Sequence, residues 1–172
     1  VQAGARDGAD RRLMRVFSHT CSNTEIVCAL GAGATLIGVD ADSDFPADIV
    51  APLPKPGRDL DLDVSAVISL RPDLVLSSLT VPGHERIVDE LRAAGLRTEV
   101  IDPLSLEDVY ASIHRIAELL GIAGRGDNCV TAMRAAMPQA KPAENPPKIL
   151  SEWWPKPVIA PGTAGGKLYP IV

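Results

Sequence analysis

One stretch, residues 14–31, constrains the fold most, because it reads as a strand, a polar turn and a helix in close succession. Its first residues are apolar and partly β-branched, which is typical of a buried strand. Ser22 and Glu25 have the spacing of a capping box, and Gly31 suits the helix end. The turn, residues 19–23, joins the carboxyl end of a strand to a helix N-terminus. Open α/β sheets bind ligands at such an edge, and the helix amides can hold a polar ligand group there.

The same alternation continues along the chain. Apolar runs predict further strands, and amphipathic segments predict helices; the strands are at residues 35–39, 74–76 and 97–101, and the helices at residues 64–70, 84–94 and 105–121. The pattern predicts an α/β fold with an open, largely parallel sheet flanked by helices. A further helix is predicted from about Asp127 to Met137, and short strands are predicted at residues 148–152 and 157–160.

Composition excludes several classes of protein. The hydrophobic fraction of 46% and charged fraction of 23% indicate a packed core. A net charge of −5 without a basic cluster argues against nucleic-acid binding. No apolar run of about 18 residues predicts a membrane span, and no signal peptide is visible, although a processed one would leave a similar start. Three cysteines make no disulfide framework: Cys28 is expected to be buried on the apolar side of the first helix, Cys129 to pack on a later helix, and Cys21 to lie in the turn.

Loops after successive strands are expected to meet at one edge, where aromatic planes with few polar groups would suit a large flat ligand. These loops are residues 19–23, 42–45 and 79–84. The candidate ligand-binding residues are Thr20, Cys21, Ser22, Asn23, Phe45, Pro82, Gly83, Trp153 and Trp154.

Two histidines fall in these loops, and each has two readings. His19 and His84 are candidate metal ligands or axial haem ligands, and the alternative for each is a solvated loop histidine. A nucleophilic pair of Cys21 and His19 lacks an identifiable acidic residue to orient it. A metal-dependent enzyme using His19, Cys21 and His84 therefore remains the second class of function, and a fragment without a ligand is the third.

Several motifs together resemble a known family. They are residues 18–25, 29–31, 37–39, 43–46 and 70–75, in this order and spacing. They resemble the amino-terminal lobe of the helical-backbone (class III) periplasmic substrate-binding proteins, the receptors of ABC importers for cobalamin, ferric siderophores and haem. Residues 152–162 resemble the first strand and ligand-facing loop of the second lobe in the cobalamin-receptor branch.

The resemblance implies two α/β lobes joined by one long helix, with the ligand between them. Residues 1–12 are then a linker or processed end, 13–122 the amino-terminal lobe, 123–146 the linking helix region, and 147–172 the incomplete start of the second lobe. It further implies a monomeric receptor in the periplasm or elsewhere outside the cytoplasm, with a metal chelate and a permease as partners. No catalysis and no intrinsic cofactor are expected.

The resemblance also assigns roles to individual residues. Phe45 matches the aromatic of the cobalamin receptors' Ser-Asp-aromatic-Pro loop, and Trp153 and Trp154 match second-lobe aromatics. The glutamate that docks this lobe onto the permease falls near Ser65, where Asp61 or Asp63 would replace its charge.

Overall fold

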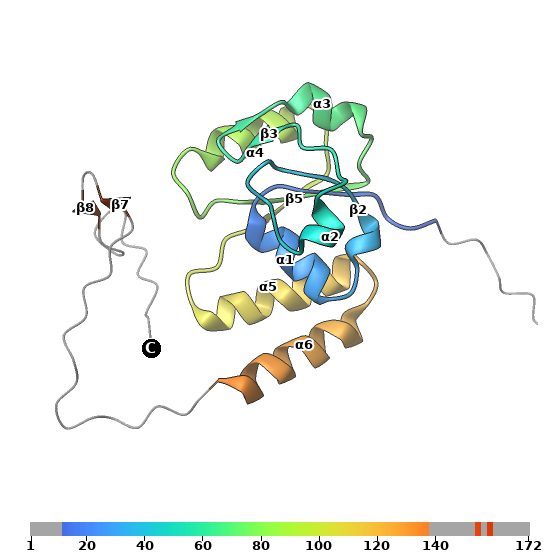
Figure 1. The fold of residues 1–172 in the computed structure, drawn as a ribbon, viewed down its shortest axis with the longest axis vertical. Helices are drawn as coiled ribbons and strands as arrows, with labels where there is room; N and C mark the ends of the chain where they lie inside the picture. The colour runs from blue at the N-terminus through green and yellow to red at the C-terminus, as the bar shows by residue number, and fades with distance from the viewer. Residues whose placement is uncertain (1–11, 138–153, 156–157, 160–172) are drawn as a thin grey trace, which may run out of the picture. The chain divides into compact units, whose positions relative to one another are not determined.

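A four-stranded sheet organises the fold (Figure 1). The computed structural model describes residues 12–137, 154–155 and 158–159, and the chain forms two compact units, residues 1–100 and 101–172. The strand order is β2-β1-β5-β6, and β1 pairs in parallel with both of its neighbours. The strands are β1 (Val16–Ser18), β2 (Leu36–Val39), β5 (Leu74–Ser78) and β6 (Thr98–Ile101). The predicted α/β class with a parallel sheet is thus confirmed.

Helices connect the strands of the first unit. They are α1 (Cys21–Ala29), η1 (Gly33–Thr35), α2 (Ala47–Val50), α3 (Val64–Ser69) and α4 (His84–Ala93). The apolar runs predicted α3, α4 and all four strands to within a few residues. The turn before α1 differs from the prediction.

The predicted N-cap of the first helix, Ser22, is wrong. The helix begins at Cys21, and the N-cap is Thr20, whose side chain makes no cap hydrogen bond. Thr20 has a φ of 87°, a conformation that is costly for a residue with a Cβ. The backbone amide of Thr20 donates to the carboxylate of Asp40. This bond from the end of the neighbouring strand stabilises the turn, and a local capping pattern cannot reveal it.

A β-hairpin between α2 and α3 was not predicted. It consists of β3 (Gly57–Arg58) and β4 (Asp61–Leu62), which pair antiparallel. Gly57 has a φ of +132°, and a Cβ there would lie 2.2 Å from the Asp61 carbonyl oxygen, so only glycine fits. Strands of two residues are too short for alternation to reveal them.

One apolar cluster of the first unit lies on one face of the sheet. Phe17 of β1 and Val75 of β5 belong to it, as do residues from the hairpin, α3 and α4. The full cluster is Phe17, Leu62, Val67, Val75, Ile87 and Leu91. Ile87 and Leu91 are one helical turn apart, so one stripe of α4 supplies both.

The second unit contains two packed helices, α5 (Leu106–Leu119) and α6 (Ala123–Ala136). Ser105 caps α5, because its Oγ accepts from the Asp108 amide and donates to the Asp108 carboxylate. A Cβ at Gly126 would lie 2.8 Å from the Ala117 Cβ, so glycine allows the two helices to approach closely. The last helix begins earlier than the predicted Asp127.

A two-stranded antiparallel pair, β7 (Trp154–Pro155) and β8 (Val158–Ile159), follows in the second unit. β8 overlaps the strand predicted at residues 157–160, whereas the strand predicted at residues 148–152 lies outside the described residues. Within the described parts of the chain, no helix is both long enough and apolar enough to cross a membrane.

Candidate functional site

The strand order creates a switch point between β1 and β5. From β1 the chain crosses to β2 on one side and later returns to β5 on the other side. In open α/β sheets, ligand sites form at the carboxyl ends of the strands where the winding direction reverses. His19 follows β1, and Ser77 and Ser78 end β5, so these residues mark that point.

His19 fills the switch point. Its ring is fully buried, its Nδ1 lies 2.8 Å from the Ser77 hydroxyl, and its Nε2 lies 2.7 Å from the Asp59 carbonyl oxygen. A carbonyl can only accept, so Nε2 carries the proton and Ser77 donates to Nδ1. Burial lowers the pKa of His19, against the opposing effect of the Asp59 carbonyl. Asn23 completes the arrangement by donating to the carbonyls of both His19 and Ser77.

His84 lies against His19. The two ring centroids are 5.1 Å apart in an edge-to-face arrangement, and His84 is buried. Its Nε2 is 3.5 Å from a carboxylate oxygen of Asp59, but neither ring nitrogen has a hydrogen-bond partner. The solvated-loop alternative is therefore wrong for both histidines.

The described residues do not support the candidate metal role of these two histidines with a complete set of ligands. Both nitrogens of His19 already contact protein oxygens. The described residues bring together no group of three or more His, Cys, Asp or Glu side chains that could hold a metal ion.

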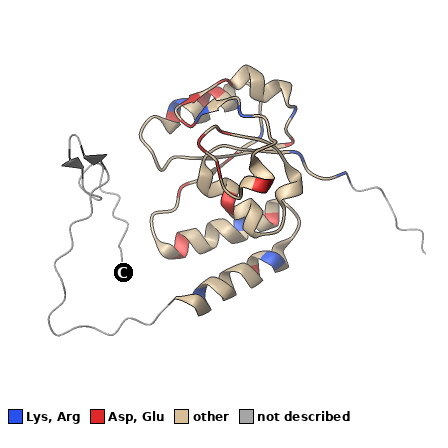
Figure 2. Cartoon of the chain, viewed as in Figure 1, with Lys and Arg blue, Asp and Glu red and all other residues tan. Residues whose placement is uncertain are grey.

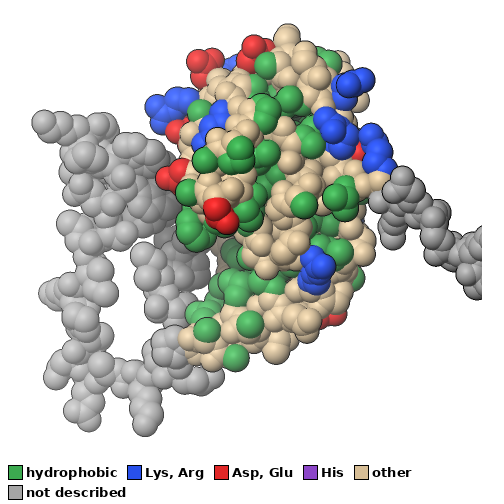
Figure 3. Space-filling view, turned by 45° about the vertical axis from the view of Figure 1, so that its right-hand side comes forward, with side chains coloured by type: hydrophobic (Ala, Val, Ile, Leu, Met, Phe, Trp, Pro, Cys, Tyr) green, Lys and Arg blue, Asp and Glu red, His purple; other side chains and the backbone are tan. Residues whose placement is uncertain are grey.

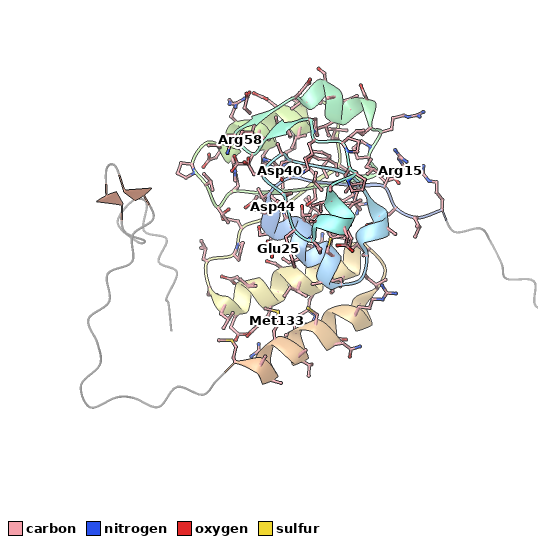
Figure 4. The ribbon with its side chains drawn as sticks, viewed as in Figure 1. Arg15, Glu25, Asp40, Asp44, Arg58 and Met133 are labelled. Carbon is pink, nitrogen blue, oxygen red and sulfur yellow. The ribbon has the colours of Figure 1, made fainter. Side chains whose placement is uncertain are left out.

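Asp40 organises the loop after β2. Its buried carboxylate accepts from the amides of Thr20, Asp42 and Ser43 and from the Ser43 hydroxyl. The bond from the Asp42 amide to the Asp40 side chain forms an Asx turn. Asp42 in turn pairs with Arg58 at 2.7 Å, and this hydrogen-bonded pair lowers the pKa of Asp42. Figure 4 labels Asp40 and Arg58, the two ends of this chain of contacts.

A second set of buried hydroxyls joins α1 to this loop. Thr24 donates to Ser18 Oγ at 2.9 Å and lies 3.0 Å from Ser43 Oγ. Because Ser43 also donates to Asp40, the network runs from β1 to the loop after β2. A helical hydrophobic pattern does not reveal such a network.

The predicted ligand-binding residues divide into exposed and buried groups. Phe45 is 62% exposed, and Cys21, Ser22, Pro82 and Gly83 are also exposed; Thr20 and Asn23 are buried and serve the turn itself. Trp153 lies outside the described residues, as does the side chain of Trp154, whose backbone begins β7. Sequence reasoning missed Leu60, which is 41% exposed at the hairpin tip.

Cys21 is exposed but not activated. Partial burial raises the pKa of its thiol, and Asp40 raises it further. A protonated thiol is a weak nucleophile, so the pairing with His19 considered from the sequence has no chemical support.

The two candidate docking carboxylates differ in environment. Asp63 is the N-cap of α3, where its side chain accepts from the Ala66 amide at 3.0 Å. Asp61 is exposed on β4. Only Asp61 therefore has no capping role.

Acidic residues predominate in the loops of this edge (Figure 2). Lys55 donates to the Ser43 carbonyl, and Arg58 is paired with Asp42. On the face drawn in Figure 3, hydrophobic side chains reach the surface in several groups. The carboxylates in and around these loops are Asp40, Asp42, Asp44, Asp59 and Asp61.

Residues 16–166 match the family described as periplasmic binding protein. The chain belongs to this family. A relative in Bacillus subtilis (strain 168), described as an uncharacterized ABC transporter substrate-binding lipoprotein, YvrC, is 34% identical over 123 residues, which are 70% of this chain and 38% of the relative. The vitamin B12-binding protein of Photorhabdus laumondii is 30% identical over 61% of this chain and 38% of its own length.

The fold matches solved structures of the same family. The periplasmic haem-binding protein RhuT from Roseiflexus sp. RS-1 aligns with a TM-score of 0.64 and 31% identity, over 72% of this chain and 47% of that protein. The chain thus spans less than half the length of these relatives. The family consists of binding proteins, in agreement with the expected absence of catalysis.

Proposed function

We propose that the chain acts outside the cytoplasm as a monomeric solute receptor of an ABC importer and captures a metal chelate. The observation that carries the proposal is the pair of exposed apolar side chains, Phe45 and Leu60, on loops beside the switch point. Large planar ligands gain affinity from such surfaces, while a few polar groups set their orientation. The names of the relatives support this ligand class, since they include vitamin B12-binding and haem-binding proteins.

The charge of the edge favours a neutral or cationic chelate. Asp44 and Asp61 are exposed, whereas the guanidinium of Arg58 is already paired with Asp42. An anionic chelate would meet this negative potential, and the nearby cations Lys55 and Arg86 are engaged with the carbonyl oxygens of Ser43 and Leu60. We therefore favour a corrinoid or a ferric siderophore without net negative charge.

Haem is the second candidate, because two histidines lie at the switch point and a haem-binding protein is among the similar structures. Both rings are buried, and His19 uses both nitrogens within the protein. An axial bond from either ring would require the loops to move. The two carboxylates of haem are also disfavoured by the charge of the edge.

Isothermal titration calorimetry with ligands matched in chemistry but not in charge tests this proposal. We expect cyanocobalamin (neutral) and aquocobalamin (cationic), or ferrichrome (neutral) and ferrioxamine B (cationic), to bind more tightly than haem or ferric enterobactin. Added salt should weaken the binding of the cationic member of a pair more than that of the neutral one. Preferential binding of haem or the anionic siderophore would contradict the proposed ligand class.

A variant pair tests the location of the site. Phe45→Ala should weaken binding about tenfold, because a ring that stacks on the ligand is lost. Ile68→Ala is the matched control, since Ile68 is a 44% exposed apolar residue on α3. Equal affinities for the two variants would place the ligand elsewhere.

The proposed importer contact is assigned to Asp61. Asp61→Asn should weaken binding to the partner permease, because the side chain is exposed, while the affinity for neutral cyanocobalamin, which carries no net charge to interact with Asp61, should not change. Asp63→Ala should instead lower stability, because it removes the cap of α3. A pull-down with detergent-solubilised importer compares the two, and unchanged capture of the Asp61 variant would contradict the assignment.

A further inference from the structure

The β3–β4 hairpin is too short to fix its own position. Each strand has two residues, and an isolated hairpin is at best marginally stable in water. Contacts from the rest of the lobe must therefore hold its tip, residues 58–60, next to the switch point.

Three side chains from other elements bond to this tip. Arg86 of α4 donates to the Leu60 carbonyl, Asp42 accepts from the Asp59 amide, and His19 donates to the Asp59 carbonyl. The contacts of Arg86 and Asp42 are made near the surface, where water competes and salt screens. The bond from His19 is made by a buried ring, where a hydrogen bond is stronger and its loss more costly.

The unpartnered ring of His84 also points to a role beyond packing. A buried polar atom without a partner is costly, and an apolar side chain would avoid that cost. The ring nevertheless lies edge-to-face with His19 and places Nε2 3.5 Å from the Asp59 carboxylate. Its position supports His19 from one side and faces the hairpin tip on the other.

We propose that His19 and His84 are positioning residues that hold the hairpin tip at the switch point, so that Leu60 is presented to the ligand. The part of this inference that concerns the ligand rests on the proposed function, whereas the part that concerns the position of the hairpin does not. Neither histidine needs to touch the ligand, since each acts through the backbone and carboxylate of Asp59.

Hydrogen–deuterium exchange of the 172-residue chain, without ligand, tests the position of the hairpin. His19→Leu should speed exchange of the peptide covering residues 58–62 about tenfold, because the buried donor is lost. His19→Gln should restore most of the protection, since its amide can donate to the Asp59 carbonyl. Val88→Ala, in the buried face of α4, controls for a general loss of stability.

His84→Leu separates positioning from packing. It should speed exchange in the same peptide severalfold while leaving the thermal unfolding midpoint unchanged or higher, because two unpartnered nitrogens are removed. A lowered midpoint with unchanged hairpin exchange would show a packing role alone and overturn the inference for His84.

Calorimetry with cyanocobalamin and ferrioxamine B completes the test. If the wild-type chain binds one of them, His19→Leu should weaken that binding about tenfold and His19→Gln should restore it. Equal binding by all variants would overturn the positioning role and leave the proposed function intact. If neither compound binds the wild type, the proposed function fails, and hairpin exchange alone decides the inference.

Discussion

Two layers on the same face of the sheet show how one scaffold serves stability and recognition. The apolar layer contains Phe17, Val75, Ile87, Leu91 and Leu62, and the polar layer nearer the carboxyl edge contains His19, Ser77, His84 and Asp59. Each contributing segment supplies both layers: Phe17 lies in β1 and His19 directly after it, and β5 contains Val75 and Ser77. Strand residues two apart share a face, so the same periodicity that buries the core also aims the polar groups.

The two layers differ in how strictly each position requires a particular residue type. Apolar contacts tolerate replacement by residues of similar volume, whereas the polar layer requires particular donors and acceptors. His19 can satisfy both Ser77 and Asp59 only in one tautomer. The apolar layer therefore supplies most of the stability, while the polar layer fixes the geometry of the edge.

Removing a side chain from the apolar layer should have the largest effect on stability. Leu91→Ala should lower the free energy of unfolding by about 3 to 4 kcal/mol, because a fully buried side chain leaves a cavity. Urea denaturation followed by circular dichroism measures the change. Ile68→Ala, on the exposed side of α3, should change it by less than about 0.5 kcal/mol. Similar losses in both variants would contradict this division of roles.

The next largest effect is expected at Asp40, in the polar network after β2. Asp40→Ala should cost about 2 to 3 kcal/mol, since it leaves the buried donors of Thr20 and Ser43 without their acceptor. Asp40→Asn retains the shape and one acceptor oxygen, so its loss in the same urea experiment should be smaller. Equal losses would show that neither the volume nor the remaining acceptor oxygen of asparagine replaces the carboxylate.

The apolar layer was largely predictable from sequence, and the polar layer was not. The runs around Phe17 and Val75 predicted β1 and β5, and the stripe containing Ile87 predicted α4. Burial of His19 depends on β5 lying beside β1 and on a hairpin that no periodicity marks. Both are long-range contacts, so a single turn read in isolation left the histidine in solvent.

The residues of the candidate site also divide into those that the sequence predicted and those that it did not. Phe45 was predicted to bind the ligand, and its ring is exposed; the predicted meeting of the first and third loops is confirmed by the contact between His19 and His84. Leu60 was missed because its exposure depends on the hairpin. Ser22 is not the cap because the helix begins before it, at Cys21, after a turn that Asp40 holds through the Thr20 amide.

The pH dependence of the free energy of unfolding should distinguish the polar layer from the apolar layer. The expected effect is smaller than that of Leu91→Ala or Asp40→Ala. Burial lowers the pKa of His19 below its ordinary value of 6.5, so the unfolded chain binds a proton that the folded chain rejects. The contribution of His19 is then fully present above pH 6.5 and is lost as the pH falls through 6.5 towards the folded pKa. The slope from this one group is at most about 1.4 kcal/mol per pH unit.

Urea titrations between neutral and mildly acidic pH measure this slope. His19→Gln should flatten it in that range, because glutamine does not titrate. His114→Gln is the matched control, since His114 is partly exposed on α5 and lies near Asp127. A slope that survives in the His19 variant would assign the acid sensitivity to another group.

The reactivity of the Cys21 thiol should show a clear pH dependence, accompanied by the smallest change in stability. Partial burial and the charge of Asp40 raise the pKa of its thiol, so alkylation by iodoacetamide should require a higher pH than for an ordinary cysteine. Rates are measured against pH in a Cys28→Ser, Cys129→Ser background, where Cys21 is the one remaining thiol. Asp40→Asn should shift the rate profile to lower pH, since the neighbouring negative charge is gone. Glu25→Gln should shift it less, because Glu25 acts on Cys21 more weakly than Asp40 does. Coincident profiles for the Asp40 variant and its parent would contradict an effect of the Asp40 side chain on the Cys21 thiol.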